Sequence, residues 1–267
     1  MATTDTRNWE RPTIFRNRYT KAAAYGSIVL VFLWSVLSME FSVSRFLAGV
    51  NEIARLTEMA IPPNFEPRFL SLYWNGIYES FGIAVLATIG GVLISIPLAF
   101  MGANNIAPRP VYYVARGVFV FTRAFHSLIV AIVFVIAFGT GALAGVLTFV
   151  FGTAGYWAKL LAEDIEDIAE NTINSIRAVG ASPLQVILYG VVPQIMPRAV
   201  GLTIYRWDQN LRGSVIVGIV GAGGIGLTLI NSYRRYEYDV TAAIIIIIVA
   251  IVMIGEVASP YIRGRVQ

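Results

Sequence analysis

Long apolar stretches separated by short polar segments dominate the sequence. A helix needs about 20 apolar residues to cross a hydrocarbon core. Six stretches approach or exceed that length: 22–41, 80–102, 113–138, 141–161, 201–229 and 241–258. The first follows a basic tail at 1–21, but its apolar run exceeds that of a signal peptide and no clear cleavage site follows it. The pattern predicts an all-α integral membrane protein with about six transmembrane helices, the first of them retained, in a single domain at 22–267.

The segment at 42–79, between the first two predicted spans, contains a second kind of pattern. Apolar residues recur there at three- or four-residue spacing: Phe46, Val50, Ile53, Leu56 and Met59. This spacing predicts an amphipathic helix, which the proline-containing sequence IPPNFEP ends. The helix either rests on the membrane surface or contacts an external partner, and the sequence leaves both open.

Composition supports a membrane protein. Of 267 residues, 57% are hydrophobic and 13% are charged, whereas soluble domains contain about 25% charged residues. Because cysteine is absent, disulfides and thiolate metal sites are excluded. The single histidine argues against a histidine-based zinc site within one chain. No metal site is therefore expected.

The distribution of basic residues predicts the orientation. They are scattered and flank the apolar spans, so the net charge of +4 does not indicate a nucleic-acid partner. Six spans place both termini on one side, where the segments contain thirteen Lys and Arg residues against five on the other side. The positive-inside rule predicts a multi-pass protein of the cell membrane with both termini in the cytoplasm. Residues 42–79 are then external and 162–198 cytoplasmic.

The predicted cytoplasmic loop at 162–198 begins with carboxylates that cannot face hydrocarbon at tolerable cost: Glu163, Asp164, Glu166, Asp167 and Glu170. Apolar residues give the same stretch one apolar side: Leu161, Ile165, Ile168, Thr172, Ile176 and Val179. It is interpreted as a helix that leaves the membrane with a solvated acidic face. Gly180 then supplies the residue type that ends helices, because glycine accepts left-handed backbone angles without strain.

A second helix is predicted directly after Gly180. Ser182 can cap it, and Pro183 suits its first helical position. Gln185 stands three residues after Ser182 and completes a capping box, in which two otherwise unpaired backbone amides find acceptors. Two further prolines follow at 193 and 197, so the helix is expected to be short.

This second helix has its own apolar pattern. Leu184, Ile187, Leu188 and Val191 fall at helical spacing and predict one apolar face. Such a face suits the groove of a partner protein. It equally suits packing on the chain's own bundle, and the residues alone do not decide between the two.

The stretch resembles the cytoplasmic EAA loop of ATP-binding cassette (ABC) importer permeases. That loop has the pattern EAA, three residues, Gly, nine residues, Ile, one residue, Leu-Pro. Asn174-Ser175-Ile176 occupies the EAA position, Gly180 the glycine, Gly190 the isoleucine and Val192-Pro193 the Leu-Pro. The opening glutamate and the isoleucine are therefore replaced. The resemblance implies contact with an ATPase subunit through Asn174, Gly180, Ala181, Ser182, Pro183, Leu184, Gln185, Ile187, Leu188 and Pro193.

The resemblance covers most of residues 40–260. YRWDQNLRGSVIVGIVGAGGIG at 205–226 is similar to phosphonate importer permeases, in which a YRW-plus-acid segment precedes GxVGAGGIG. It implies a MetI-like type I ABC importer fold and a homodimer joined to two ATPase subunits. An external solute-binding protein would deliver a phosphonate, phosphate or phosphite-like anion. ATP and magnesium would bind the ATPase, and this chain would hold no cofactor.

Two apparent nucleotide motifs have better explanations. GAGGIG matches a dinucleotide-binding pattern through Gly221, Gly223 and Gly226, but it ends an apolar span and lacks the required strand and acidic residue. Close helix packing or a bend in the helix is expected there. Neither Lys21 nor Lys159 completes the Gly-Lys-Ser/Thr of a phosphate loop, so the energy must come from a partner or an ion gradient.

Charges within the predicted spans mark the candidate translocation path. Arg123 and His126 lie three residues apart in the third span, which predicts that they share one helix face. Arg206, Asp208 and Arg212 open the fifth span. Charges at membrane depth are costly and usually mark a cavity, a path or a buried pair. Asp208 and Arg212 have the spacing of an internal ion pair. The alternative hypothesis is that these five residues border a path that favours an anion.

Three other assignments stay open at this point. The chain could serve an ABC importer for another small solute, or an ion-gradient secondary transporter that needs no ATPase. A membrane enzyme would need clustered acid, base, nucleophile or metal-binding residues. Apart from the acidic run at 163–170, no such cluster is visible, so no catalytic residue is assigned.

Overall fold

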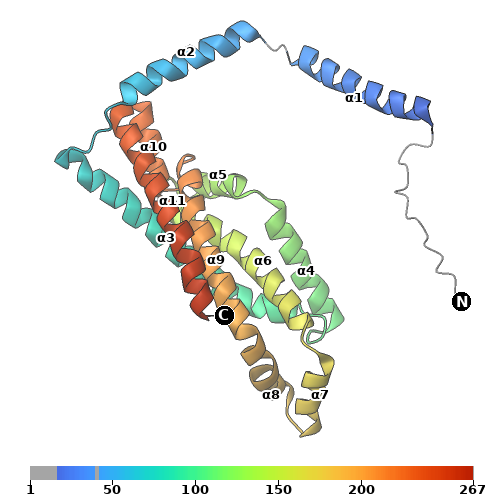
Figure 1. Cartoon of the computed structure of the whole chain (residues 1–267). Coiled ribbons are helices and arrows are strands. Elements are labelled where there is room, and N and C mark those ends of the chain that lie inside the picture. Colours follow the sequence, from blue (N-terminus) through green and yellow to red (C-terminus); the bar gives the residue numbers. More distant parts are fainter. Residues whose placement is uncertain (1–16, 40–41, 267) are drawn as a thin grey trace, which may run out of the picture. The chain divides into compact units, whose positions relative to one another are not determined.

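The computed structural model describes residues 17–39 and 42–266, with side chains up to residue 257. Within these ranges the chain is helical and contains no strand (Figure 1). The helices are α1 (Arg18–Ser38), α2 (Val43–Ala60), α3 (Pro67–Met101), α4 (Arg109–Ala124), α5 (Ser127–Phe138), α6 (Ala142–Glu166), α7 (Glu170–Ala178), α8 (Pro183–Gln185), the π-helical turn η1 (Val186–Val191), α9 (Val192–Gly218), α10 (Gly224–Arg234) and α11 (Tyr238–Val266). The all-α prediction is confirmed.

The number of spans also agrees with the sequence. Among the described residues, five helices are long and apolar enough to cross a membrane: α1, α3, α6, the run Pro183–Gly218, and α11 over Tyr238–Val257. The pair α4 and α5 passes the same test jointly, which gives up to six spans. The amphipathic helix predicted after the first span is α2. Its place outside the membrane stays a prediction.

The chain divides into two compact units, residues 1–57 and 58–267. The first contains α1, and the second contains every helix that carries a predicted site residue. Residues 1–16 of the predicted cytoplasmic tail lie outside the described residues. The single domain at 22–267 stays a prediction.

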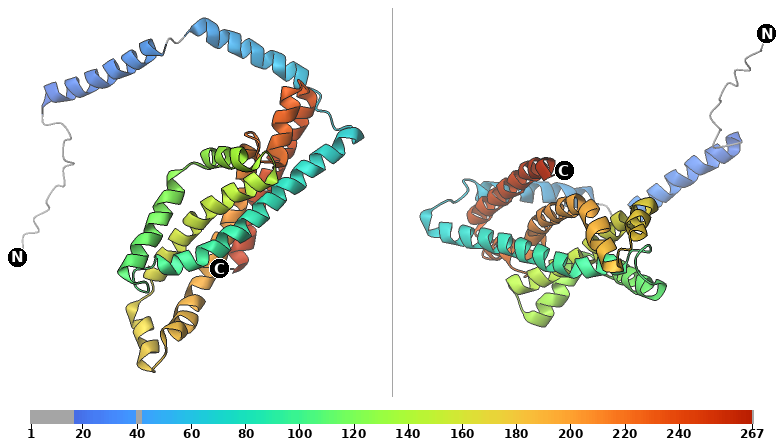
Figure 2. Two further views of the ribbon diagram at one scale, coloured as in Figure 1. Left: turned by 180° about the vertical axis from the view of Figure 1, so that it is seen from behind. Right: turned by 90° about the horizontal axis from the view of Figure 1, so that it is seen from below.

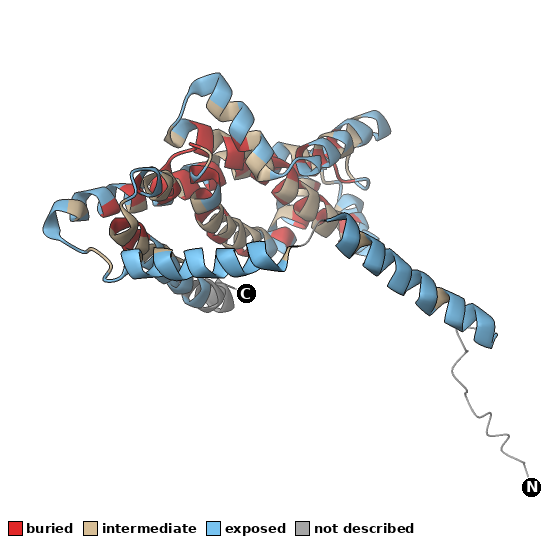
Figure 3. Cartoon of the chain, turned by 90° about the horizontal axis from the view of Figure 1, so that it is seen from above, coloured by how far each residue is buried: buried red, intermediate tan, exposed pale blue. Residues whose placement is uncertain are grey.

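The core of the second unit lies where α3, α6 and α9 meet, and buried residues gather in the interior of this bundle (Figure 3). Small residues set the helix spacing. A Cβ on Gly91 of α3 would lie 2.5 Å from Cβ of Thr153 on α6, closer than the about 3.5 Å of ordinary contact. The side chain of Thr122 on α4 similarly occupies the space above Gly155 of α6. The bundle is therefore held by close backbone approach, as is common between membrane helices.

The second predicted span, 80–102, is longer than expected. Its helix, α3, begins at Pro67, a residue suited to a first helical turn. Residues 67–79 are therefore helical and continuous with the predicted span. The loop before α3 is fixed by Asn64, whose Nδ2 donates to Asp239 Oδ2 at 2.9 Å and whose carbonyl accepts from the Tyr73 hydroxyl at 2.6 Å.

The third predicted span, 113–138, is not one helix. α4 ends at Ala124 and α5 begins at Ser127, with a bend of 89° between them. His126 has an extended backbone, and its Nδ1 accepts the N–H of Leu128 at 3.3 Å. The histidine thus acts as the N-cap of α5. Arg123 and His126 do not share a helix face, so that inference from their spacing was wrong.

The fifth predicted span, 201–229, is likewise interrupted. α9 ends at Gly218 and α10 begins at Gly224. Gly221, Gly223 and Gly224 all have positive φ between these helices, which side chains other than glycine rarely adopt. The expected break or close packing at GAGGIG is confirmed.

The segment at 162–198 differs from its prediction in two places. The acidic stretch is not one helix, because α6 ends at Glu166 and α7 begins at Glu170. The register shifts at this break, so Ile173 is buried while Val179 is exposed. The helix after Ser182 is not short either, because α8, η1 and α9 form one helical run from Pro183 to Gly218. Figures 1 and 2 show α7 and α8 projecting together from one end of the bundle.

Candidate functional site

The projecting turn between α7 and α8 is built as its sequence predicts. Gly180 has φ +83° and ends α7. Ser182 Oγ accepts the Gln185 N–H at 3.4 Å, and Gln185 Oε1 accepts the Ser182 N–H at 2.8 Å. The capping box is therefore present, and it fixes the start of the helical run that becomes α9.

The apolar side chains predicted to form one face of this run point partly toward the bundle and partly toward the surface. Val191 is fully buried in the chain's own core, while Leu184 and Leu188 are 64% and 49% exposed. The cause is the π-turn η1, in which the Val192 N–H donates to the Ile187 carbonyl. This carbonyl lies five residues back, whereas an α-helical hydrogen bond reaches four residues back. The single face predicted from 184, 187, 188 and 191 was therefore wrong, because it assumed a regular α-helix. One part of it packs on the bundle, and the other part remains exposed.

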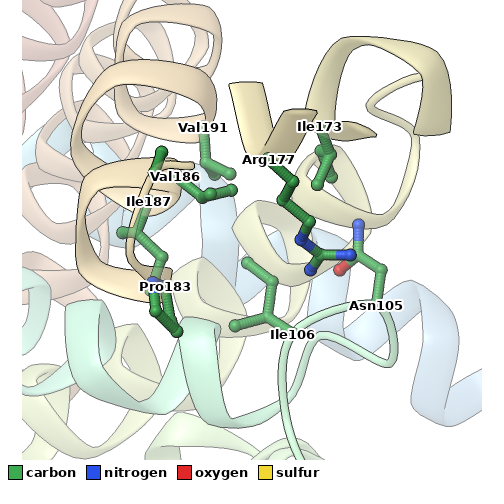
Figure 4. A pocket seen from close by; sticks show the side chains of 9 residues that line it. Asn105, Ile106, Ile173, Arg177, Pro183, Val186, Ile187 and Val191 are labelled. Carbon is green, nitrogen blue, oxygen red and sulfur yellow. The ribbon is translucent and has the colours of Figure 1, made fainter. Parts of the chain in front are cut away.

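A pocket of about 250 Å³ lies between the two arms of the projection. Figure 4 shows Pro183, Ile187 and Val191 on one side, Ile173 and Arg177 on the α7 side, and Asn105 and Ile106 beneath. The Arg177 side chain extends across the pocket toward the loop after α3 (Figure 4). Asn105 is held by a 2.8 Å hydrogen bond from its Nδ2 to the Ile165 carbonyl. The pocket is thus rigidly joined to the end of α6.

The two positions that depart from the EAA-loop pattern have clear surroundings. Asn174 is exposed on α7. Gly190 is buried, and a Cβ there would lie 2.7 Å from Cδ1 of Ile176. Ile176 stands in the EAA position and fills the space that an isoleucine at 190 would need. Ile176, where the pattern has alanine, and Gly190, where it has isoleucine, therefore complement each other in volume across the α7–η1 contact.

The acidic residues at the end of α6 are ion-paired more than the sequence suggested. Glu166 accepts from Arg116 of α4 and from the Asn104 backbone N–H, both at 2.7 Å. Lys159 contacts Glu163 at 3.0 Å, and Arg198 contacts Asp164 at 3.4 Å. The Arg116–Glu166 and Arg198–Asp164 pairs tie α4 and α9 to α6 at the end that bears the projection. The sequence interpretation of the acidic run as a solvated surface did not include these ion pairs between helices.

The charges in α9 fall into two groups with different partners. Asp208 is 3% exposed and accepts from Arg212 one turn later. Arg212 also contacts Glu256 of α11, which the sequence interpretation did not include. The internal Asp208–Arg212 pair expected as one alternative is therefore present, and it compensates both charges within the bundle.

Arg206 belongs to the second group, a polar cluster at the level of mid-α6. Its Nε donates to Thr153 Oγ1 at 3.0 Å, and its guanidinium lies 5.1 Å from the ring centre of Tyr156. Asn210 Nδ2 donates to Thr153 Oγ1 at 3.2 Å and to Thr88 Oγ1 at 2.9 Å. Sequence reasoning missed Thr88, Thr153, Tyr156 and Asn210. Asn210 carried a signal, since an amide within an apolar span needs hydrogen-bond partners.

The remaining predicted path residues lie at the α4–α5 bend. Arg123 is in the last turn of α4, and His126 caps α5; both are exposed in the single chain. Among the described side chains, no group of three or more His, Asp or Glu residues is placed to hold a metal ion.

The comparisons with known proteins place this geometry in a family. Residues 91–267 match the family described as binding-protein-dependent transport system inner membrane component. The chain belongs to this family. It is a multi-pass inner-membrane protein, and its core is that of a transport permease.

Relatives of known name and structure agree. The chain is 37% identical over 88% of its length to the phosphite transport system permease PtxC of Stutzerimonas stutzeri, covering 85% of that protein. It is 39% identical over 77% of its length to the phosphate-import permease PhnE of Mycolicibacterium smegmatis, covering 38% of that longer protein. A chain of the inward-facing MetNI methionine ABC transporter superposes with a TM-score of 0.65 at 20% identity, over 76% of this chain and all of that one. The fold is therefore that of a MetI-like ABC permease, as predicted.

Proposed function

We propose that this chain is the membrane-spanning permease subunit of an ABC importer for phosphorus oxyanions such as phosphonate, phosphite or phosphate. Family membership supports import through a binding-protein-dependent system. The substrate class is supported by relatives named for phosphite and phosphate transport and by the YRW-plus-acid and GAGGIG segments. An external binding protein delivers the anion and sets most of the specificity, and two copies of this chain form the path.

The observation that carries the coupling mechanism is the unbroken helical run from Pro183 to Gly218. Its capped start projects from the bundle, and Arg206 lies in its transmembrane part. A continuous helix transmits displacement along its axis, because its backbone hydrogen bonds resist stretching. Movement of the ATPase pair on binding ATP and magnesium therefore tilts the helix that lines the path. The projection is cytoplasmic in this arrangement.

The docking surface for the ATPase consists of the exposed apolar side chains around the capped turn. Val179, Leu184, Leu188 and Tyr189 are 83%, 64%, 49% and 73% exposed. Apolar residues exposed beside a rigid turn outside the membrane are typical of a protein–protein interface. The remaining predicted coupling residues lie in α7, in the turn and in the helical run that follows it: Asn174, Gly180, Ala181, Ser182, Pro183, Gln185, Ile187 and Pro193.

Co-purification with the neighbouring transport components tests the docking surface. Leu184→Asp should lower the amount of ATPase retained per permease by at least about tenfold, because a buried unpaired charge costs well over 1.4 kcal/mol. The matched control is Asn171→Asp, which introduces the same charge at an exposed position of α7. Equal ATPase retention by both variants, with the bundle intact, would refute docking at this surface.

Uptake by the reconstituted complex tests the substrate class. Proteoliposomes containing the permease and its ATPase should import radiolabelled phosphate, phosphite or a simple phosphonate only with the binding protein outside and ATP inside. Uptake driven by an ion gradient without ATPase would refute the importer mechanism. Import restricted to solutes without phosphorus would refute the substrate class alone.

A further inference from the structure

Arg206 is a cation without a carboxylate partner inside the bundle. Its described contacts are the Thr153 hydroxyl and the face of the Tyr156 ring. Arg212, two turns further along α9, differs because Asp208 and Glu256 compensate its charge. A buried or half-buried arginine is normally paired with an anionic group. In the single chain, Arg206 therefore lacks an anion to compensate its charge.

The depth of Arg206 makes this lack of a partner costly. The pair between Arg198 and Asp164 lies at the end of the bundle that bears the projection. Arg206 follows Arg198 by eight residues of α9 and so lies about 12 Å further into the bundle at 1.5 Å per residue, well inside a hydrocarbon core of about 30 Å. Its partner Thr153 is also close to the middle of α6. A charged side chain deep in a bilayer is costly and usually marks a pathway or a binding function.

Further donors surround the guanidinium. The Tyr156 and Tyr205 rings stack with centroids 6.4 Å apart, and Gln209 Nε2 donates to the Tyr205 hydroxyl at 3.1 Å. Gly152 lets the guanidinium lie close to the α6 backbone, since a Cβ there would lie 3.0 Å from Arg206 Nη2.

A second guanidinium lies on the neighbouring helix. Arg123 of α4 follows Thr122, whose side chain packs against Gly155, the residue before Tyr156. Its charge also acts electrostatically on the Tyr156 hydroxyl. Arg123 is exposed and has no ion pair among the described side chains. Two uncompensated cations thus approach the same aromatic pair.

We propose that Arg206, together with Arg123 and the Tyr156–Tyr205 pair, forms a transient binding station for one tetrahedral phosphorus oxyanion midway along the path. This inference rests on the proposed function. It assigns the contact with the transported anion to Arg206 and not to Arg212. The guanidinium fork matches two oxygens of the anion, and the tyrosine hydroxyls donate to others. The anion can leave again, because only the two guanidinium charges hold it. Phosphate, phosphite and phosphonate share this chemistry.

Transport by the intact complex provides the first test. Arg206→Gln should lower uptake of radiolabelled inorganic phosphate or phosphite per ATP hydrolysed by at least tenfold, while ATP hydrolysis stimulated by the binding protein persists. Arg206→Lys should recover part of the uptake. The control is Arg68→Gln, which removes a guanidinium that is 68% exposed near the start of α3. Uptake by Arg206→Gln within twofold of the control would overturn the station.

A labelling experiment keeps the inference testable with Arg206 intact. The chain has no cysteine, so Gln209→Cys supplies one thiol beside the station. It should react at least tenfold faster with an anionic than with a cationic methanethiosulfonate, and phosphate should slow the reaction. Equal rates for the two reagents, without an effect of phosphate, would overturn the inference. If the unmodified complex imports no phosphorus oxyanion, the proposed function fails and the ligand of the station fails with it.

Discussion

The close contact between α3 and α6 makes a sharp prediction about Gly91. A Cβ at this position would lie 2.5 Å from Cβ and 2.6 Å from Cγ2 of Thr153. Ordinary carbon–carbon contact needs about 3.5 Å, so Gly91→Ala must push the two helices apart by about 1 Å. Thr153 Cβ is attached to the backbone and cannot move aside by rotation. The same Thr153 holds Arg206 and Asn210.

The magnitude follows from these distances. Overpacking a well-packed core lowers the free energy of unfolding by about 1–3 kcal/mol. The better helix propensity of alanine offsets about 0.5–1 kcal/mol of this loss. Gly91→Ala should therefore destabilise the permease by up to about 2.5 kcal/mol. Gly82→Ala is the matched control on the same helix, because no atom lies within 4 Å of its added Cβ. This control should be neutral or slightly stabilising.

Thermal unfolding of the purified permease in detergent, followed by size-exclusion chromatography after heating, measures the difference. The Gly91→Ala midpoint should fall by several degrees while the Gly82→Ala midpoint stays or rises. Anion uptake should decrease only in Gly91→Ala, since displacement of Thr153 also displaces Arg206. Equal midpoints for the two variants would refute the close approach of α3 and α6.

Three further predictions concern single contacts. Arg212→Gln leaves the buried Asp208 carboxylate without its partner, so it should destabilise the permease by about 3–5 kcal/mol. The double variant Arg212→Gln with Asp208→Asn should recover most of this stability in the same heating assay. Arg116→Met removes the cation that holds Glu166 at 2.7 Å, and limited proteolysis should then cleave the 102–108 and 167–169 loops at least several-fold faster than in the unmodified permease. Gly180→Ala forces a side chain into φ +83° at a cost of about 1–2 kcal/mol, and ATPase retention should fall while the heating midpoint of the bundle hardly changes.

Each of these has an outcome that contradicts it. A double variant no more stable than Arg212→Gln would show that the Asp208 charge is compensated elsewhere. Unchanged proteolysis of Arg116→Met would show that Glu166 does not hold the end of α6. Full ATPase retention by Gly180→Ala would show that the geometry of the turn does not matter for docking.

Several features of the fold were predictable because they depend on neighbouring residues. The apolar stretches gave the spans, and the spacing from Phe46 to Met59 gave the helix α2. The Ser182–Gln185 capping box formed as its four-residue pattern indicates. Gly180 ended α7 as its backbone freedom allows.

Other features depend on contacts between distant segments, and the sequence pattern failed there. Pro193 was expected to end a helix, but it lies in the first turn of α9 directly after the π-turn, and the helix continues. The bend at 125–126 was hidden in a continuous apolar stretch. A proline disrupts a helix where its ring and its missing N–H conflict with the preceding turn, and the pattern of apolar residues does not show the geometry of that turn.

The sequence by itself therefore determined that this chain is a helical membrane protein, where most of its helices lie and how its projecting turn is capped. Only the tertiary structure decided which charges are compensated. Asp208 and Arg212 meet within one helical turn, whereas Arg206 finds Thr153 across 53 positions of the chain and no carboxylate. The physical reason is range: helix propensity and capping act over about four residues, but the cost of a charge inside a membrane depends on every helix packed around it.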